Sequence, residues 1–160
     1  MTGDKDKIAR ITRRGGFRLA LPAAEAFKLF TAAGERLWVP GWSPEILGPL
    51  PQQPGLVFLT GDGVERTIWT VIESDPGAGR VRYSRVTPAS RAGTVTVEVS
   101  PAEGGCHVDV AYDLTALGPD GAPSLDAYSP RRFTEMLEHW RALIEDLLAR
   151  ETPDLAALVA

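Results

Sequence analysis

TVTVEVSPAEGGCHVDVAYDLT, residues 94–115, decides the fold of this chain. Apolar residues take every second position on both sides of the turn sequence Glu103-Gly104-Gly105. Alternation of this kind is typical of paired strands with one dry face and one wet face. The stretch therefore predicts an antiparallel β-hairpin. Its dry face would hold Val95, Val97, Val99, Val108, Val110, Tyr112 and Leu114.

More strands are predicted before this hairpin. Turn signals made of Gly, Pro and Asp recur at short intervals through residues 45–117. The runs between them are rich in Val, Ile, Thr, Tyr and Trp, which predicts a meander of antiparallel strands. The strand around Trp69 leaves its inward face open, because isoleucines occupy one side of it and Trp69 and Val71 the other.

The N-terminal part predicts one further strand and a short helix. Residues 8–21 have strand character, and Gly15-Gly16 predicts a bulge or a bend within it. Pro22 fits the first turn of a helix, where its missing N–H costs nothing, so residues 23–30 are expected to be helical.

The C-terminal part predicts a long amphipathic helix over residues 130–150. Ser129 is a favourable N-cap and Pro130 a favourable first residue. A helix of this length extends about 30 Å. The polar stretch 118–128 before it is expected to be a mobile loop. The apolar stripe contains Phe133, Met136, Leu137, Trp140, Ile144 and Leu147.

These elements together predict an α+β domain. A curved antiparallel sheet would wrap around the long C-terminal helix, with short helices after the first strand. The length of 160 residues fits a single domain spanning residues 1–160. Because a curved sheet cannot touch a straight helix along its whole length, a gap is expected between them. Either that gap is an open pocket or large aromatic side chains fill it.

Three segments carry a resemblance to a known superfamily. The sequence Leu-Trp-Val-Pro-Gly-Trp at 37–42, the strand Trp-Thr-Val at 69–71 and the final helix resemble START-like (SRPBCC) proteins. That group includes birch-pollen-allergen-like proteins, polyketide cyclases and activators of the heat-shock ATPase. The resemblance covers residues 10–150. It implies a helix-grip fold and a deep pocket for lipids, sterols, polyketides or other apolar molecules.

Composition argues against several other classes of protein. The chain has 17 Lys and Arg against 21 Asp and Glu, a net charge of −4, which is unfavourable for binding nucleic acid. Neither of the two histidines, His107 and His139, has a second His or Cys at the spacing typical of metal ligands. We therefore predict no metal and no cofactor. Cys106 is the only cysteine, which leaves no intramolecular disulfide. The first residues lack the apolar run of a signal peptide, and no stretch is apolar over the length needed to span a membrane. We therefore expect no membrane insertion and a cytoplasmic location.

Aromatic and polar residues of the predicted inner surface are the candidate ligand contacts. Trp38 and Trp42 flank a Pro-Gly turn and either form a lid or anchor the loop in the core. Tyr83 and Tyr112 either orient a ligand or bond to backbone, and Arg85 and Arg66 either face the pocket or, as is commoner for arginine, the solvent. The predicted ligand-binding set is Trp38, Trp42, Trp69, Tyr83, Arg85, Tyr112, Phe133, Met136 and Trp140; no catalytic residue is predicted.

Three functions remain open at this point. The first is binding of a small hydrophobic molecule in an internal pocket. The second is an enzyme similar to polyketide cyclases or aromatases, in which a few polar groups assist proton transfer. The third is a protein-interaction module similar to the heat-shock-ATPase activators. The oligomeric state is undetermined, and a homodimer is compatible with the sequence.

Overall fold

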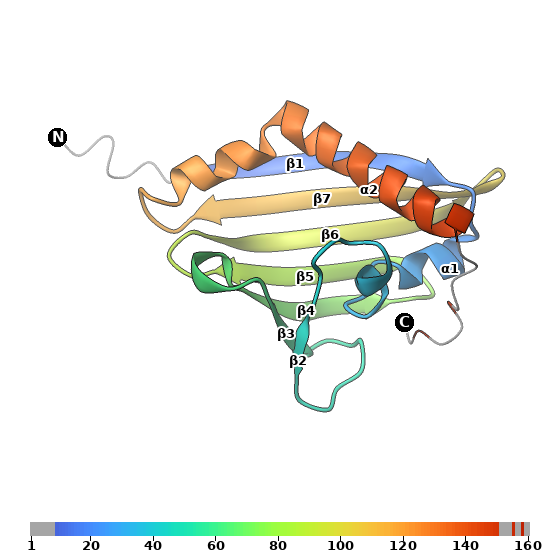
Figure 1. Ribbon diagram of the computed structural model, residues 1–160, viewed down its shortest axis with the longest axis horizontal. Coiled ribbons are helices and arrows are strands. Elements are labelled where there is room, and N and C mark those ends of the chain that lie inside the picture. Colours follow the sequence, from blue (N-terminus) through green and yellow to red (C-terminus); the bar gives the residue numbers. More distant parts are fainter. Residues whose placement is uncertain (1–8, 151–154, 156–157, 159–160) are drawn as a thin grey trace.

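The architecture is a single curved sheet with a long helix lying across it (Figure 1). The structure is a computed structural model and describes residues 9–150, 155 and 158. The strands are β1 (Arg10–Leu19), β2 (Glu45–Leu47), β3 (Val57–Thr60), β4 (Thr67–Asp75), β5 (Arg80–Thr87), β6 (Arg91–Ala102) and β7 (Gly105–Ala116). The helices are α1 (Ala23–Lys28), α2 (Pro130–Arg150) and the short 3-10 turns η1 (Gly34–Leu37), η2 (Gly63–Glu65) and η3 (Ala122–Tyr128).

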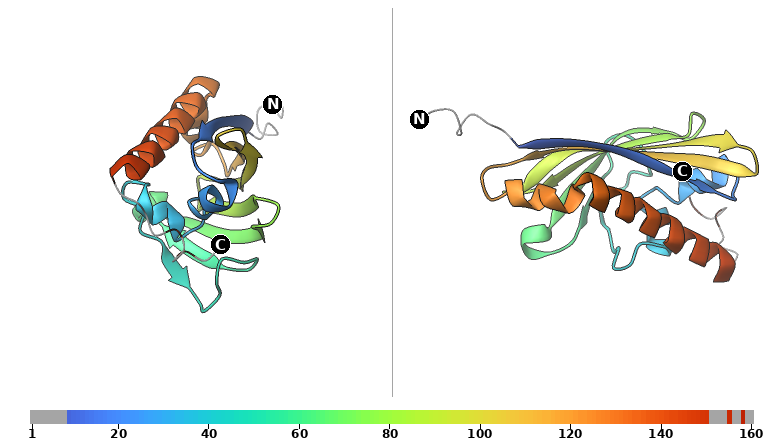
Figure 2. Two further views of the ribbon diagram at one scale, coloured as in Figure 1. Left: turned by 90° about the vertical axis from the view of Figure 1, so that its right-hand side faces the viewer. Right: turned by 90° about the horizontal axis from the view of Figure 1, so that it is seen from above.

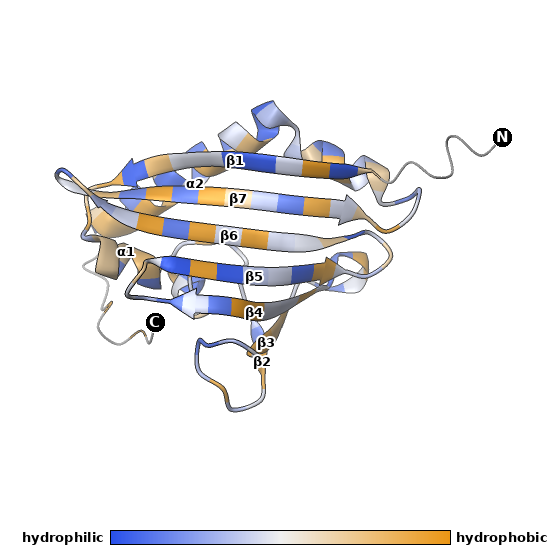
Figure 3. Cartoon of the chain, turned by 180° about the vertical axis from the view of Figure 1, so that it is seen from behind, coloured by the Kyte–Doolittle hydropathy of each residue, from blue (hydrophilic) through white to orange (hydrophobic). Residues whose placement is uncertain are grey.

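All neighbouring strands of the sheet run antiparallel, in the order β1-β7-β6-β5-β4-β3-β2. The predicted hairpin is the pair β6 and β7, with Val97 opposite Val110 and Val95 opposite Tyr112. Its alternating residues are buried on the inner face as expected. Figure 3 shows the result from behind, where apolar and polar bands alternate along the middle strands. The helix-grip α+β fold is thereby confirmed.

Helix α2 has the bounds that the sequence predicts, Pro130 to Arg150. The Ser129 hydroxyl accepts a hydrogen bond from the Arg132 amide at 3.3 Å, which caps the first turn. The helix crosses the concave face of the sheet, lying mainly against β1 (Figure 2). Its buried residues are Phe133, Leu137, Ile144 and Leu147.

The bulge expected at Gly15-Gly16 is absent, and Gly15 instead allows close packing of α2. Strand β1 pairs with β7 in unbroken register through both glycines, so no bulge exists there. A Cβ at Gly15 would lie 2.7 Å from Leu137 Cδ1, so the missing side chain lets α2 approach the strand closely. The register shift occurs instead in β4, between Val71 and Glu73.

The open question about β4 is settled by burial. Trp69 and Val71 point to the inner face and are buried, whereas Ile68 and Ile72 are exposed on the outer face. Ile72 is the extra residue at the register shift. Three of these four residues are aliphatic, so hydropathy alone could not identify the inner face.

The N-terminal helical segment closes one end of the sheet. Helix α1 packs on β6 and β7, and its Phe27 is buried. Residues 118–128, expected to be a mobile loop, instead contain η3, which buries Leu125. Arg13 Nε donates a hydrogen bond to the Tyr128 carbonyl oxygen at 2.6 Å and thereby ties η3 to β1. The strand predicted from residue 8 begins at Arg10, residue 8 itself lying outside the described part.

Neither a membrane-spanning helix nor a cluster of metal ligands is present in the part of the chain that the structure describes. No helix there is long and apolar enough to cross a membrane. No group of three or more His, Cys, Asp or Glu residues gathers there as metal ligands would.

Candidate functional site

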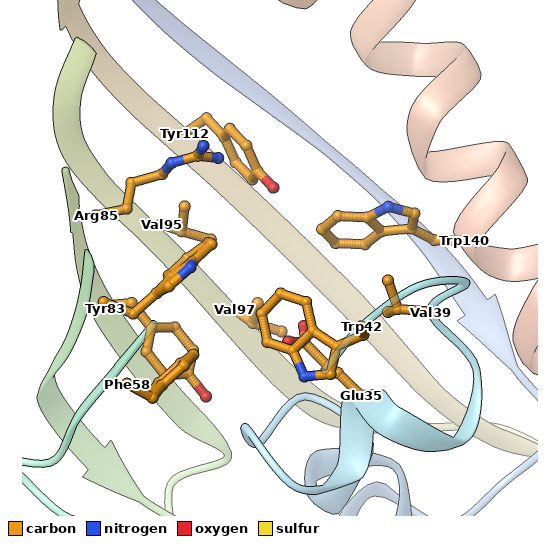
Figure 4. A pocket seen from close by; sticks show the side chains of 11 residues that line it. Glu35, Val39, Trp42, Phe58, Tyr83, Arg85, Val95, Val97, Tyr112 and Trp140 are labelled. Carbon is orange, nitrogen blue, oxygen red and sulfur yellow. The ribbon is translucent and has the colours of Figure 1, made fainter. Parts of the chain in front are cut away.

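A cavity of about 180 Å³ lies between the inner face of the sheet, the 35–42 segment and α2 (Figure 4). The sheet contributes residues from β3 to β7, and α2 contributes Trp140. The gap between bowed sheet and straight helix is therefore partly open in this protein. The lining residues are Glu35, Val39, Trp42, Phe58, Trp69, Tyr83, Arg85, Val95, Val97, Tyr112 and Trp140.

Aromatic rings form most of the wall. Phe58 and Trp69 stack with ring centres 5.8 Å apart and planes 3° from parallel, and Trp42 meets both edge-on. The N–H groups of these two indoles are satisfied within the protein: Trp42 donates to the Ala32 carbonyl at 2.9 Å and Trp69 to Thr60 Oγ1 at 2.8 Å. Trp42 and Trp69 therefore present apolar faces, with no unpaired donor, to the cavity.

Six of the nine predicted ligand-binding residues line this cavity: Trp42, Trp69, Tyr83, Arg85, Tyr112 and Trp140. Trp38 does not, because its indole donates to the Leu29 carbonyl at 2.8 Å and its ring packs edge-on against Trp140. Of the two roles considered for Trp38, it thus has that of loop anchor. Phe133 packs behind Tyr112, with the ring centres 5.4 Å apart, and Met136 is half-buried against the core.

The two candidate arginines have opposite environments. Arg66 is exposed and pairs with Glu45 at 2.7 Å, as expected for a surface arginine. For Arg85 the expectation of solvent exposure is wrong, since only 7% of the residue is accessible. Its guanidinium lies 5.0 Å from the centre of the Trp69 ring and donates to the Tyr128 hydroxyl at 3.4 Å. Stacking on an indole makes burial of this cation tolerable.

The two buried tyrosines also differ. The Tyr83 hydroxyl donates to the Phe30 carbonyl at 2.7 Å and accepts from Gln52 Nε2 at 2.9 Å, so protein groups already occupy it. No described residue bonds to the Tyr112 hydroxyl, and Tyr112 lines the cavity. Burial raises the pKa of both phenols, which keeps them protonated and neutral.

Glu35 is the charged residue among the five lining residues that the predicted set lacks, which are Glu35, Val39, Phe58, Val95 and Val97. It lies in η1, is half-buried, and extends toward the inner face of the sheet (Figure 4). Desolvation by burial raises the pKa of its carboxyl well above the ordinary value. In the described part of the chain no hydrogen bond or ion pair reaches this carboxyl. The sequence carried no signal for Glu35, because Val39, four residues further on and also in the cavity wall, is absent from the predicted set as well.

Replacing Glu35 by glutamine is expected to stabilise the protein near neutral pH. A raised carboxyl pKa means that the folded state binds the proton more tightly than the unfolded chain, whose glutamate pKa is about 4.3. The native protein therefore loses stability as pH rises from about 4.3 through the raised pKa of Glu35. The total loss in free energy of unfolding is about 1.4 kcal/mol for each unit by which the folded-state pKa exceeds the unfolded-state pKa. Glutamine, which is neutral at every pH, removes that loss.

Urea unfolding of Glu35→Gln and the native protein at a series of pH values measures this difference. The free-energy gain should vanish below pH of about 4, where glutamate is protonated in both states. Glu138→Gln, which removes an exposed glutamate of α2, should lack this pH dependence. A Glu35→Gln gain that stays constant across the whole range would show that burial of charge is not its cause.

Fold and family together define the class of this protein: a helix-grip domain of the START-like (SRPBCC) superfamily. The chain belongs to the polyketide cyclase / dehydrase and lipid transport family, whose sequence model matches residues 12–145.

Solved structures share the fold at low sequence identity. Ara h 8.0201 is 16% identical with a TM-score of 0.65, the match covering 89% of this chain and 100% of that one. Norcoclaurine synthase from Thalictrum flavum is 12% identical with a TM-score of 0.62, covering 87% and 88%. A putative uncharacterized protein from Rhizobium leguminosarum is 14% identical with a TM-score of 0.65, covering 88% and 97%. A search of the curated proteins found no match.

Proposed function

We propose that the protein binds a compact hydrophobic molecule in the cavity between the sheet and α2. The observation that carries this proposal is the cavity wall, where six aromatic rings and three valines surround about 180 Å³ of space. Concave sites with apolar walls and a few polar groups are the usual form of small-molecule sites. The family, which includes lipid-transport proteins, supports the same conclusion.

The cavity volume favours a small ligand. An apolar cavity of about 150 Å³ is large enough for benzene, whereas pockets for drug-sized molecules span about 300–1,000 Å³. A volume of about 180 Å³ therefore suits a molecule with one ring better than a sterol or a long lipid. Burial of about 200 Å² of ligand surface would contribute about 5 kcal/mol before the costs of association.

Filling the cavity tests this proposal. Val97→Phe adds a ring to the inner face of β6 inside the cavity, so it should abolish the rise in melting temperature produced by single-ring aromatic compounds. Thr96→Phe adds the same ring to the neighbouring position, which lies on the opposite face of β6, and should leave the rise intact. Fluorescence of the lining tryptophans reports binding independently. Equal ligand effects in both variants would place binding elsewhere.

An enzyme of the polyketide-cyclase type is the second candidate. It requires ionisable or hydroxyl groups inside the cavity, and Glu35, Arg85 and Tyr112 supply them. A carboxyl beside an apolar ligand can exchange protons with an acidic C–H bond next to a carbonyl. Deuterium exchange into phenylacetone tests this chemistry directly. A rate for the native protein no higher than that for Glu35→Gln would exclude proton transfer by Glu35.

A further inference from the structure

Glu35 is a carboxyl group with no positive partner, placed in the wall of an apolar cavity. The described part of the chain supplies neither a hydrogen-bond donor nor a cation to it. Buried carboxylates are normally paired, because an isolated charge in a poorly solvated site is costly. A cavity-lining acid without its cation therefore indicates that the missing charge belongs to a ligand.

The groups that face Glu35 across the cavity do not compensate its charge. The sheet contributes Tyr83, Arg85 and Tyr112, and α2 contributes the uncharged Trp140. Burial is the cause of the raised pKa of Glu35, with no lowering contribution from Arg85. Arg85 is engaged instead with the Trp69 ring and the Tyr128 hydroxyl. Figure 4 shows the two charged residues apart from each other in the cavity wall, with Arg85 beside Tyr112. The cavity thus has an acidic end and a basic end.

Aromatic faces favour a cation at the acidic end. The faces of Trp and Tyr rings attract ammonium groups, most strongly where water is excluded. Trp42, Tyr112 and Trp140 line the cavity together with Glu35, and none of them carries a cation in the described structure. A ligand ammonium at this end of the cavity would meet both the carboxylate and these rings.

We propose that the cavity selects an organic cation, a protonated amine on a compact apolar body, whose charge pairs with the Glu35 carboxylate. This inference rests on the proposed function, because it names the class of ligand for the same cavity. Because burial raises the pKa of the Glu35 carboxyl, the protonated fraction of Glu35 loses its proton when the ammonium binds. For that fraction the step is Glu35–COOH + R–NH₃⁺ giving Glu35–COO⁻ paired with ⁺H₃N–R, plus one proton released to solvent. Proton release on binding of an amine that is already protonated is the distinctive consequence.

Benzylamine and benzyl alcohol are matched probes, because they have the same ring and nearly the same shape and differ in charge. Isothermal titration near neutral pH, in two buffers of different ionisation enthalpy, measures affinity and proton release together. We expect the native protein to bind benzylamine at least about tenfold more tightly than benzyl alcohol, as for a charge-assisted hydrogen bond in a poorly solvated site. Binding of benzylamine should release up to one proton.

Glu35→Gln should abolish both the preference for benzylamine and the proton release. Glu138→Gln makes the same change of charge on the exposed side of α2 and should retain both. Equal affinity for the two probes, or a preference that survives in Glu35→Gln, would overturn the assignment of a cationic ligand and leave hydrophobic binding intact. Failure of both probes and of toluene to bind would overturn the proposed function as well.

Discussion

Replacing Phe58 by alanine lowers the free energy of unfolding by about 3–5 kcal/mol, the largest loss we expect from a single side chain of the cavity wall. Phe58 is 1% exposed and contacts three rings: it stacks on Trp69 and meets Trp42 and Tyr83 edge-on. Removing it deletes these contacts and leaves a void, because the two ladders of β3 hold the surrounding backbone in place.

The same substitution should change which ligands fit. The void left by Phe58 adjoins the cavity, so the enlarged space should accept a two-ring compound such as 2-naphthol that the native cavity of about 180 Å³ is too small to hold. Urea unfolding measures the loss of stability, and titration of tryptophan fluorescence measures the gain in binding.

Phe27→Ala is the matched control for Phe58→Ala. Phe27 is equally buried, but it lies in α1 and does not line the cavity. It should lose a similar free energy of unfolding without gaining affinity for 2-naphthol. If both variants gained affinity for 2-naphthol, general loosening of the core would explain the result. The conclusion that Phe58 limits the size of the cavity would then be wrong.

Gly93→Ala should destabilise the protein by about 3 kcal/mol, although it adds a single methyl group. Gly93 lies in β6 opposite Arg85 of β5 and Leu114 of β7. A Cβ there would overlap the carbonyl oxygen of Asp113 and come within 3.0 Å of Leu114 Cα. Both are backbone atoms of a strand paired on both edges, so relief requires the ladder between β6 and β7 to part.

Gly77→Ala is the comparison for this glycine. Its Cβ would meet only Asp75 Oδ1, at an ordinary contact distance of 3.5 Å, and its φ is not in the left-handed region. Alanine there should be neutral or stabilise by less than about 1 kcal/mol through the unfolded state. Thermal and urea unfolding of the two variants decide the matter. A loss below about 1 kcal/mol for Gly93→Ala would mean that the hairpin is loosely paired.

The sequence alone was sufficient for the hairpin and the long helix. In the hairpin, apolar residues recur with period two, and in residues 130–150 they recur with the period of a helix. Both periods depend only on local backbone geometry. Ser129 and Pro130 mark the helix start through groups that bond within one turn. These elements accordingly have the predicted bounds or lie close to them.

The site was predicted in part. Inward aromatic residues such as Tyr83 and Tyr112 were identifiable because the alternation of their strands places them on the apolar face. Arg85 and Glu35 illustrate the limit. An isolated arginine or glutamate in a sequence is usually exposed. Here the surrounding rings bury Arg85, and η1 places the half-buried Glu35 in the cavity wall.

The local sequence pattern therefore determined the strands, the long helix and the apolar inner surface of this protein. The tertiary structure alone decided that the register shift falls in β4 and that α2 packs closely on the strand at Gly15. It alone also decided that one acidic and one basic residue face a common cavity. The physical reason is range. Periodicity and capping act over a few residues of chain, whereas burial of charge and the size of a void depend on surfaces brought together from β3, η1 and α2.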